Sequence, residues 1–244
     1  GCPRLDGAPL HRAEIRRLAA AAQVTCKDGA ISPGLINAHD HITFTKAEPG
    51  THPSNRYNHR HEWRKGVSGD PSRPAINVPG NNNAQAIQYG ELRQVLAGTT
   101  SLNGSGSAAG LLRNIDTNAQ EGLGQPPVSY ETFPLGDSGG QMIAMGCGYP
   151  GIDTPADIPA AAAYLPHVSE GIEASAQNEF RCVSSTTGGG QNLLGPRTAF
   201  VHGIGLKAAD VGLMAQTKTG LIWSPRSNIS LYGDTASIPL YTRM

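Results

Sequence analysis

The sequence predicts an α/β fold, and a single parallel α/β barrel is the arrangement that fits it best. Short apolar runs recur along the chain, and most are followed by a polar loop and then a helical stretch. Strand and helix in repeated alternation indicate parallel βαβ units. The length of 244 residues is close to the roughly 250 residues that one such barrel occupies.

Each expected element can be placed on the sequence. Strands are predicted at residues 34–37, 99–103, 128–133, 164–168, 199–202 and 220–223. Helices are predicted at residues 84–97, 111–118, 155–163, 172–180 and 207–217, and the basic run 12–22 also has helical character. The long polar stretch 43–83 interrupts this rhythm, and a loop of that length in a compact domain is usually functional or disordered.

Composition argues against several classes of protein. Lys plus Arg and Asp plus Glu both total 19, so no electrostatic affinity for nucleic acid or an anionic membrane is expected. Hydrophobic residues make up 38% and charged residues 16%, which favours a packed core over disorder. No apolar run reaches the about 20 residues of a membrane span. Neither a cysteine zinc site nor a disulfide framework is expected, because the cysteines lie far apart: Cys2, Cys26, Cys147 and Cys182.

The segment 32–41 carries the strongest chemical signal. A short apolar run at 34–37 is followed by His39-Asp40-His41. Side chains alternate along a strand, so His39 and His41 project the same way and can bind one cation. Neutral imidazole is a common zinc ligand. Active sites lie at the C-terminal ends of barrel strands, so this pair predicts a metal site there.

Two later strand ends add polar side chains to this site. His167 lies near the end of the strand predicted at 164–168, and Glu170 follows three residues later. His202 ends the next strand, 35 residues after His167, which suits one βαβ step. Histidines at successive strand ends are hard to explain as core packing, and we expect them to converge on one pocket.

The chemistry of this site follows from its residue types. Three imidazoles around a cation leave a position open for water, whose pKa falls from 15.7 toward about 7. Glu170 could take a proton from the water and return it to a leaving nitrogen, while His202 polarises the electrophile. These roles predict attack of hydroxide on a trigonal carbon and hydrolysis of its C–N bond; the resemblance described next implies that the substrate is small and cyclic.

Taken together, the motifs resemble those of the amidohydrolase superfamily, in its metal-dependent deaminase and chlorohydrolase-like branch. The resemblance spans about residues 26–236. The similar segments are 33–41, 97–100, 167–170, 201–203 and 224–228, which resemble motifs at the first, second, fifth, sixth and seventh strands.

The resemblance assigns roles to individual residues. Glu170 would shuttle protons, and His202 would face the water or the leaving group of the substrate. The metal ligands would be His39, His41 and His167. Substrate-lining residues would include Arg226 and Asn228.

The resemblance also implies a TIM-like (β/α)8 barrel, here incomplete at its C-terminal end. The family's remaining metal ligand is an Asp after the eighth strand, which has no match before Met244, and Asp234 lies too close to the seventh strand. Residues 24–31 would be a remnant of the family's small β-sandwich domain. We therefore expect an N-terminal segment at 1–33 and a hydrolase barrel at 34–244.

One metal ion is expected rather than two. Binuclear members of the superfamily bridge two metals with a modified lysine on the fourth strand, whereas no lysine lies between Val67 and Leu206. Zinc is the default for a histidine-rich hydrolytic site. Iron and manganese stay open, because nitrogen and oxygen ligands discriminate weakly between metals.

The polar stretch after the first strand contains a second cluster, residues 56–64. Trp63 and Arg64 are predicted to fold over the barrel mouth and bind a flat, polar or acidic substrate. The alternative is a solvated loop anchored by Trp63. His59 and His61 are not expected to bind metal, because no apolar strand precedes them.

Three alternatives to an active metal hydrolase are open. Residues 136–140 match a serine-nucleophile segment centred on Ser138, although the alternating strands and helices oppose an all-β protease. Residues 104–109 fit the fingerprint of an NAD-dependent oxidoreductase but lack its acidic residue about 20 positions on. The third alternative is a catalytically inactive fragment, because an unclosed barrel leaves sheet edges exposed.

The expected partner is a small-molecule substrate, without nucleic acid and without a membrane span. Exposed edges of an unfinished barrel would favour a homo-oligomer. A cytoplasmic location is favoured, with an exported lipoprotein as the alternative suggested by Gly1 and Cys2.

Overall fold

The computed structural model describes residues 28–30, 32–47, 55–104, 111–117, 125–160 and 162–244. The chain divides into two units, Gly1–Pro33 and Gly34–Met244, and the second contains the helices and strands described below. The helix predicted at 12–22 lies outside the described residues, as does most of the β remnant predicted at 24–31.

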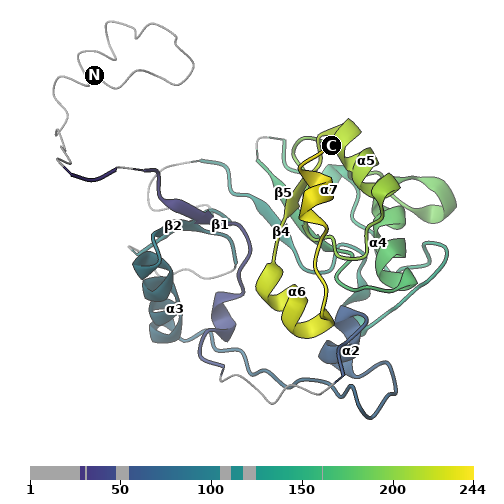
Figure 1. Ribbon diagram of the computed structural model, residues 1–244, viewed down its shortest axis with the longest axis horizontal. Helices are drawn as coiled ribbons and strands as arrows, with labels where there is room; N and C mark the ends of the chain where they lie inside the picture. Colours follow the sequence, from purple (N-terminus) through teal and green to yellow (C-terminus); the bar gives the residue numbers. More distant parts are fainter. Residues whose placement is uncertain (1–27, 31, 48–54, 105–110, 118–124, 161) are drawn as a thin grey trace, which may run out of the picture. The chain divides into compact units, whose positions relative to one another are not determined.

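The described strands form two parallel sheets (Figure 1). The first sheet consists of β1 (Leu35–Asn37), β2 (Thr99–Leu102) and β3 (Arg113–Asn114). The second consists of β4 (Ser129–Glu131), β5 (Tyr164–Val168), β6 (Ala199–His202) and β7 (Gly220–Ile222). In both sheets the spatial order follows the chain order, as consecutive βαβ units require. The predicted α/β class with parallel strands is therefore confirmed, whereas a closed barrel stays a prediction.

Local signals in the sequence fix most helix ends. The helix α3 (Ala84–Leu96) begins after Asn83, whose side chain accepts a hydrogen bond from the Gln85 amide. The helix α6 (Pro225–Tyr232) begins with a proline and ends at Gly233, which adopts the left-handed conformation. The other helices are α2 (Arg60–Lys65), α4 (Ala174–Ser184), α5 (Ala208–Thr217) and α7 (Ile238–Tyr241). Single 3-10 turns lie at η1 (Ile42–Phe44), η3 (Asp137–Gly139), η4 (Pro155–Asp157) and η5 (Thr187–Gly189).

Three expected elements differ in the structure. The helix predicted at 111–118 is wrong, because β3 pairs there with β2 and the buried Asn114 side chain donates to Glu91. The helix predicted at 155–163 is reduced to the turn η4, since a Thr154–Asp157 capping box holds one turn and Ile158 is already extended. The polar stretch 43–83 contains α2, whose first residues are buried rather than solvated.

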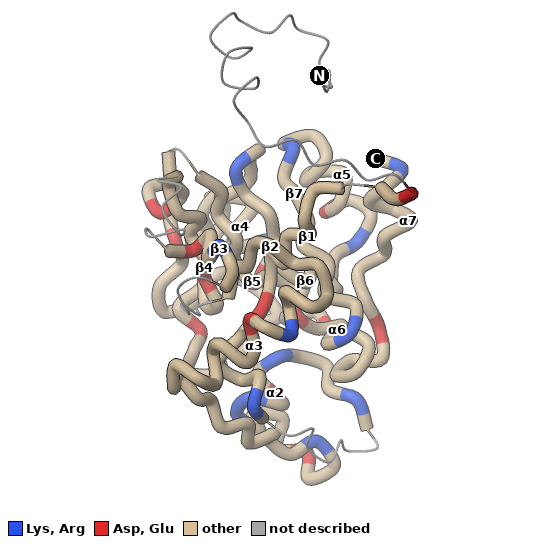
Figure 2. Tube along the Cα trace, turned by 90° about the vertical axis from the view of Figure 1, so that its left-hand side faces the viewer, with Lys and Arg blue, Asp and Glu red and all other residues tan. Residues whose placement is uncertain are grey.

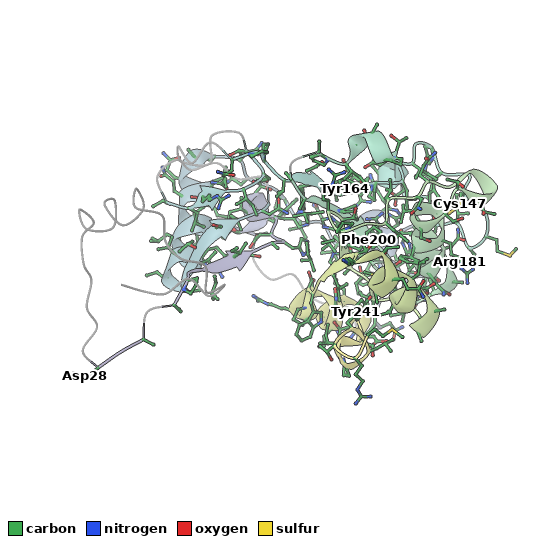
Figure 3. The ribbon with its side chains drawn as sticks, turned by 90° about the horizontal axis from the view of Figure 1, so that it is seen from above. Asp28, Cys147, Tyr164, Arg181, Phe200 and Tyr241 are labelled. Carbon is green, nitrogen blue, oxygen red and sulfur yellow. A yellow bond between two sulfur atoms is a disulfide. The ribbon has the colours of Figure 1, made fainter. Side chains whose placement is uncertain are left out.

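The largest hydrophobic cluster packs around the second sheet. It includes Tyr164 and Phe200 (Figure 3), and the Phe200 ring meets Phe180 of α4 edge-on at 5.7 Å. Cys147 and Cys182 form a disulfide that ties the segment before β5 to α4. The expectation that no disulfide would form was therefore wrong. Sequence spacing alone does not show that two cysteines 35 positions apart lie together.

Charge is distributed evenly over the described chain. Basic and acidic residues are interspersed along the trace (Figure 2), in agreement with a formal net charge of zero. Within the described part, none of the helices combines the length and apolar character that crossing a bilayer requires.

Candidate metal centre

Three histidines from the two sheets bring their ring nitrogens together. His39 and His41 follow β1, and His167 lies in β5. The Nε2 atom of His39 is 3.3 Å from Nε2 of His41 and 3.0 Å from Nε2 of His167. The rings thus offer a group of ligand atoms that all lie within 4.8 Å of one another. The structure brings together the three residues that were predicted as ligands.

The spacing of these nitrogens fits a bound cation. Ligands at tetrahedral angles and the usual zinc–nitrogen distance of about 2.0–2.1 Å stand about 3.3–3.4 Å from one another. His167 Nδ1 lies 3.0 Å from the Glu131 carbonyl oxygen, which can only accept a hydrogen bond. In the neutral ring its Nε2 therefore carries a lone pair directed at His39. A cation between the rings would take up this lone pair by coordination.

Burial keeps the three rings neutral. Burial, together with the neighbouring His202 and His41, lowers the pKa of His39 to about 2. Burial also lowers the pKa of His167 well below its ordinary value. It lowers the pKa of His41 as well, although the charge of Glu170 opposes the shift. Neutral imidazole is the form that binds metal, so these rings need not lose protons on binding.

Hydroxyl groups contact two of the histidine rings. The Ser224 hydroxyl lies 2.6 Å from His39 Nδ1, and the Tyr130 hydroxyl lies 3.0 Å from His41 Nδ1 and 3.1 Å from its Nε2. Such partners fix the ring orientation of metal ligands and raise their basicity. Sequence analysis did not single out Tyr130, because a tyrosine in a short strand gives no spacing signal.

Glu170 and His202 lie beside the three histidines. The Glu170 carboxylate accepts a hydrogen bond from the Tyr232 hydroxyl at 2.8 Å and is 3.4 Å from His202 Nε2. His202 Nδ1 is 2.9 Å from Asn228 Oδ1, which accepts and so places the ring proton on Nδ1. The His202 ring centroid is 4.9 Å from that of His39. A buried carboxylate and a fixed imidazole therefore face the candidate metal position.

A cavity of about 620 Å³ opens beside this group. His39 and His41 line it together with Asp40, Trp223, Ser224 and Arg226. Its volume falls in the range of about 300–1,000 Å³ that is typical of small-molecule sites. Trp223 follows β7 and has an exposed side chain. It was not predicted to line the site.

The four residues predicted to bind substrate occupy different places. Arg226 lines the cavity, whereas Asn228 is fully buried behind His202. Trp63 donates to the Tyr232 hydroxyl at 2.8 Å. The Arg64 guanidinium lies over the Phe133 ring at 4.2 Å. Direct contact of these side chains with a substrate stays a prediction.

A second histidine group, His59 and His61 with Glu179, is fully buried and could hold a cation by distance alone. Its ring lone pairs are already engaged, however. His59 Nδ1 accepts from the His61 amide at 3.2 Å, and His61 Nδ1 lies 2.8 Å from the Arg64 guanidinium, which can only donate. The Nε2 atoms therefore carry protons, and they face Glu179 at 3.1 Å and Asp137 at 2.7 Å. This group is a network of buried ion pairs rather than a ligand set.

The described part of the structure adds no geometric support for a serine nucleophile or for a dinucleotide-binding site. Ser138 lies in η3, where its neighbour Asp137 is the residue that contacts a histidine. Most of the fingerprint at 104–109 lies outside the described residues.

Comparison with known proteins identifies one distant structural neighbour. No family model and no curated protein matches the sequence. Among solved structures, the chain is similar to the crystal structure of an adenosine deaminase from Xanthomonas campestris with bound zinc, at 15% identity and a TM-score of 0.40. The match covers 86% of this chain and 53% of the deaminase, so the chain spans about half the length of that protein. At this distance the likeness carries no conclusion about function.

Proposed function

We propose that the chain is a metal-dependent hydrolase that cleaves a C–N bond of a small cyclic substrate, by deamination or by amide or amidine hydrolysis. The observation that carries this proposal is the meeting of three neutral imidazoles whose Nε2 atoms lie 3.0 and 3.3 Å apart. His39, His41 and His167 would hold one divalent cation, with zinc preferred and iron or manganese as alternatives.

The cation, when bound, would supply a nucleophile at neutral pH by lowering the pKa of water. Glu170 is placed to take a proton and return it to a leaving nitrogen. The hydrogen bond from Tyr232 holds one oxygen of this carboxylate, so the other oxygen is directed toward His202. His202 Nδ1 donates a hydrogen bond to the Asn228 side-chain oxygen, so Nε2 is the atom directed at the electrophile or the leaving group.

We also propose that the two parallel sheets are parts of an incomplete TIM-like barrel of the amidohydrolase superfamily. The chain order of the strands supports this proposal. So does the position of the histidines at the C-terminal ends of β1, β5 and β6, where barrel enzymes place their active sites.

The test compares ligand variants with a variant of the proton shuttle. His39→Ala and His167→Ala should lose both bound zinc, measured by elemental analysis, and turnover on a panel of cyclic amidines and aminopurines. Glu170→Gln should keep zinc and lose turnover by about 10²–10⁴-fold. Circular dichroism checks that each variant is folded. Retention of zinc in both histidine variants would overturn the ligand assignment, and zinc binding without turnover on any substrate would favour the inactive fragment.

A further inference from the structure

We propose that Glu179 of α4 is a positioning residue for Glu170, acting through the turn at Ser169. The inference rests on the proposed function, because that function gives Glu170 its role in proton transfer. The Glu179 carboxylate accepts a hydrogen bond from the Ser169 amide at 2.7 Å, and both residues are fully buried. Glu179 therefore holds the peptide that joins Val168 to Ser169, one peptide before Glu170, although it lies nine positions beyond Glu170 in the chain.

The turn that Glu179 holds decides where Glu170 points. Ser169 has a φ of +58°, in the left-handed region that residues other than glycine adopt only when their surroundings impose it. This turn redirects the chain directly after β5, so that Glu170 faces His202 beside the strand that carries His167. The Ser169 carbonyl oxygen accepts a hydrogen bond from the Ile204 amide at 3.0 Å, which fixes the next peptide unit, the one that joins Ser169 to Glu170.

The segment around α2 holds both Glu179 and the Glu170 backbone. The Glu179 carboxylate lies 3.1 Å from His59 Nε2 and 3.5 Å from the Arg60 guanidinium. The Arg60 amide donates to the carbonyl oxygen of Glu170 at 3.0 Å. The peptide after Glu170 thus contacts this buried anchor directly through Arg60, and the peptide before Ser169 contacts it through Glu179.

Electrostatics keeps this anchor ionised. Burial raises the pKa of Glu179, but the charge of Arg60 and the contact with His59 outweigh burial and lower it. An ionised carboxylate is a stronger acceptor for the Ser169 amide than a neutral group of the same shape. Arg60 is in turn fixed by Asp137 at 2.5 Å and by the Thr132 carbonyl oxygen at 2.8 Å.

The experiment compares Glu179→Gln with Glu173→Gln in the full chain loaded with zinc. Glu173 precedes the same helix, and its carboxylate accepts from the Ser175 hydroxyl rather than from the turn, so its variant is the matched control. Amide hydrogen exchange, followed by mass spectrometry, should accelerate about ten- to a hundredfold at residues 168–171 in Glu179→Gln. Exchange in β6 and zinc content should not change, and Glu173→Gln should match the wild type throughout.

Kinetics supplies the second readout on any substrate that the protein turns over. In Glu179→Gln, kcat should fall by about 10–100-fold with KM changed less than about twofold, because the shuttle is misplaced while the binding cavity is intact. If Glu179→Gln does not fold, Glu179→Asp replaces it. Aspartate keeps the charge beside Arg60 but withdraws the carboxylate from the Ser169 amide, so the same acceleration of exchange is expected.

The outcomes separate this inference from the proposed function. Unchanged exchange at residues 168–171 overturns the positioning role. Acceleration across all of α4 and β6 with loss of zinc overturns it too, since that result means a general structural role. Hydrogen exchange does not need turnover, so absence of zinc binding or of activity in the wild type refutes the proposed function and leaves the exchange result to decide the role of Glu179.

Discussion

The substitution Asp137→Asn tests the ion-pair network that anchors α2. Asp137 is fully buried, and one carboxylate oxygen lies 2.5 Å from Arg60 and 2.7 Å from His61. Burial alone would raise the pKa of Asp137, but the hydrogen bond from His61 and the charge of Arg60 outweigh it and lower the pKa to about 2. Asparagine keeps the shape of the side chain and removes the charge, so it isolates this electrostatic contribution.

The size of the effect follows from the two pKa values. The difference between 3.8 in the unfolded chain and about 2 in the folded one, at about 1.36 kcal/mol per pH unit, amounts to about 2 kcal/mol at pH 7. Removing one partner of a buried pair commonly costs about 3–5 kcal/mol. Arg60 retains Glu179 at 3.5 Å and the Thr132 carbonyl oxygen. We therefore expect Asp137→Asn to lower the free energy of unfolding by about 2–3 kcal/mol at pH 7.

The dependence on pH distinguishes this explanation from a packing defect. Because the folded pKa is the lower one, the stabilisation is complete well above pH 3.8 and disappears as the pH falls toward 2. Urea unfolding of wild type and variant should show a difference that shrinks to about 1 kcal/mol at pH 3. Asp234→Asn, at an exposed position, is the control and should change stability by less than about 0.5 kcal/mol. A difference that is the same at pH 7 and pH 3 would refute the electrostatic explanation.

Three further predictions concern other contacts. Cys147→Ser should lower the free energy of unfolding by about 3–4 kcal/mol, because the disulfide closes a loop between positions 35 apart. Equal unfolding midpoints in urea for the variant and the oxidised wild type would contradict this prediction. Ser224→Ala should weaken zinc affinity about 10–100-fold in a chelator competition, because it removes the hydroxyl that contacts His39. Unchanged affinity would mean that the serine does not support this ligand. Tyr232→Phe frees one oxygen of Glu170, so turnover should fall with zinc content unchanged, whereas loss of zinc would mean that the tyrosine supports the whole site.

The positions of the candidate ligands were predictable because strands impose a simple geometry. The bounds of β5 and β6 agree with the predicted residues 164–168 and 199–202, and β1 begins one residue later than predicted. In a parallel sheet the C-terminal ends of the strands lie at the same edge, so His167 and His202, on the neighbouring strands β5 and β6, could be expected to meet. The strand β1 belongs to the other sheet, so only the predicted barrel gave reason to expect His39 and His41 beside them.

The groups that support the site could not be predicted in the same way. Tyr130, Tyr232 and Glu179 act on residues that lie 89, 62 and 10 positions away in the chain. None of these separations corresponds to a local motif. Glu179 in particular reads in the sequence as an ordinary polar residue of a helix, and only the packing of α4 against the turn after β5 gives it a partner. The short strand β3 was missed because two residues carry too little periodicity to oppose a helical interpretation.

The pattern His-x-His occurs twice in the chain, and hydrogen bonding to the backbone explains why the two copies differ. His41 and His59 both stand immediately before a helical turn, as N-cap residues of η1 and α2. The His59 ring accepts a hydrogen bond from an amide of its own helix, which uses the lone pair on Nδ1 and places a proton on Nε2. The His41 ring makes no capping hydrogen bond, so it remains able to turn toward His39 and present a nitrogen to it. A protonated Nε2 can only donate, which suits the carboxylate of Glu179, whereas an unprotonated one suits a cation. The capping hydrogen bond that the His59 ring accepts and the His41 ring does not, rather than the spacing of the histidines, thus separates the buried ion-pair network from the candidate metal centre.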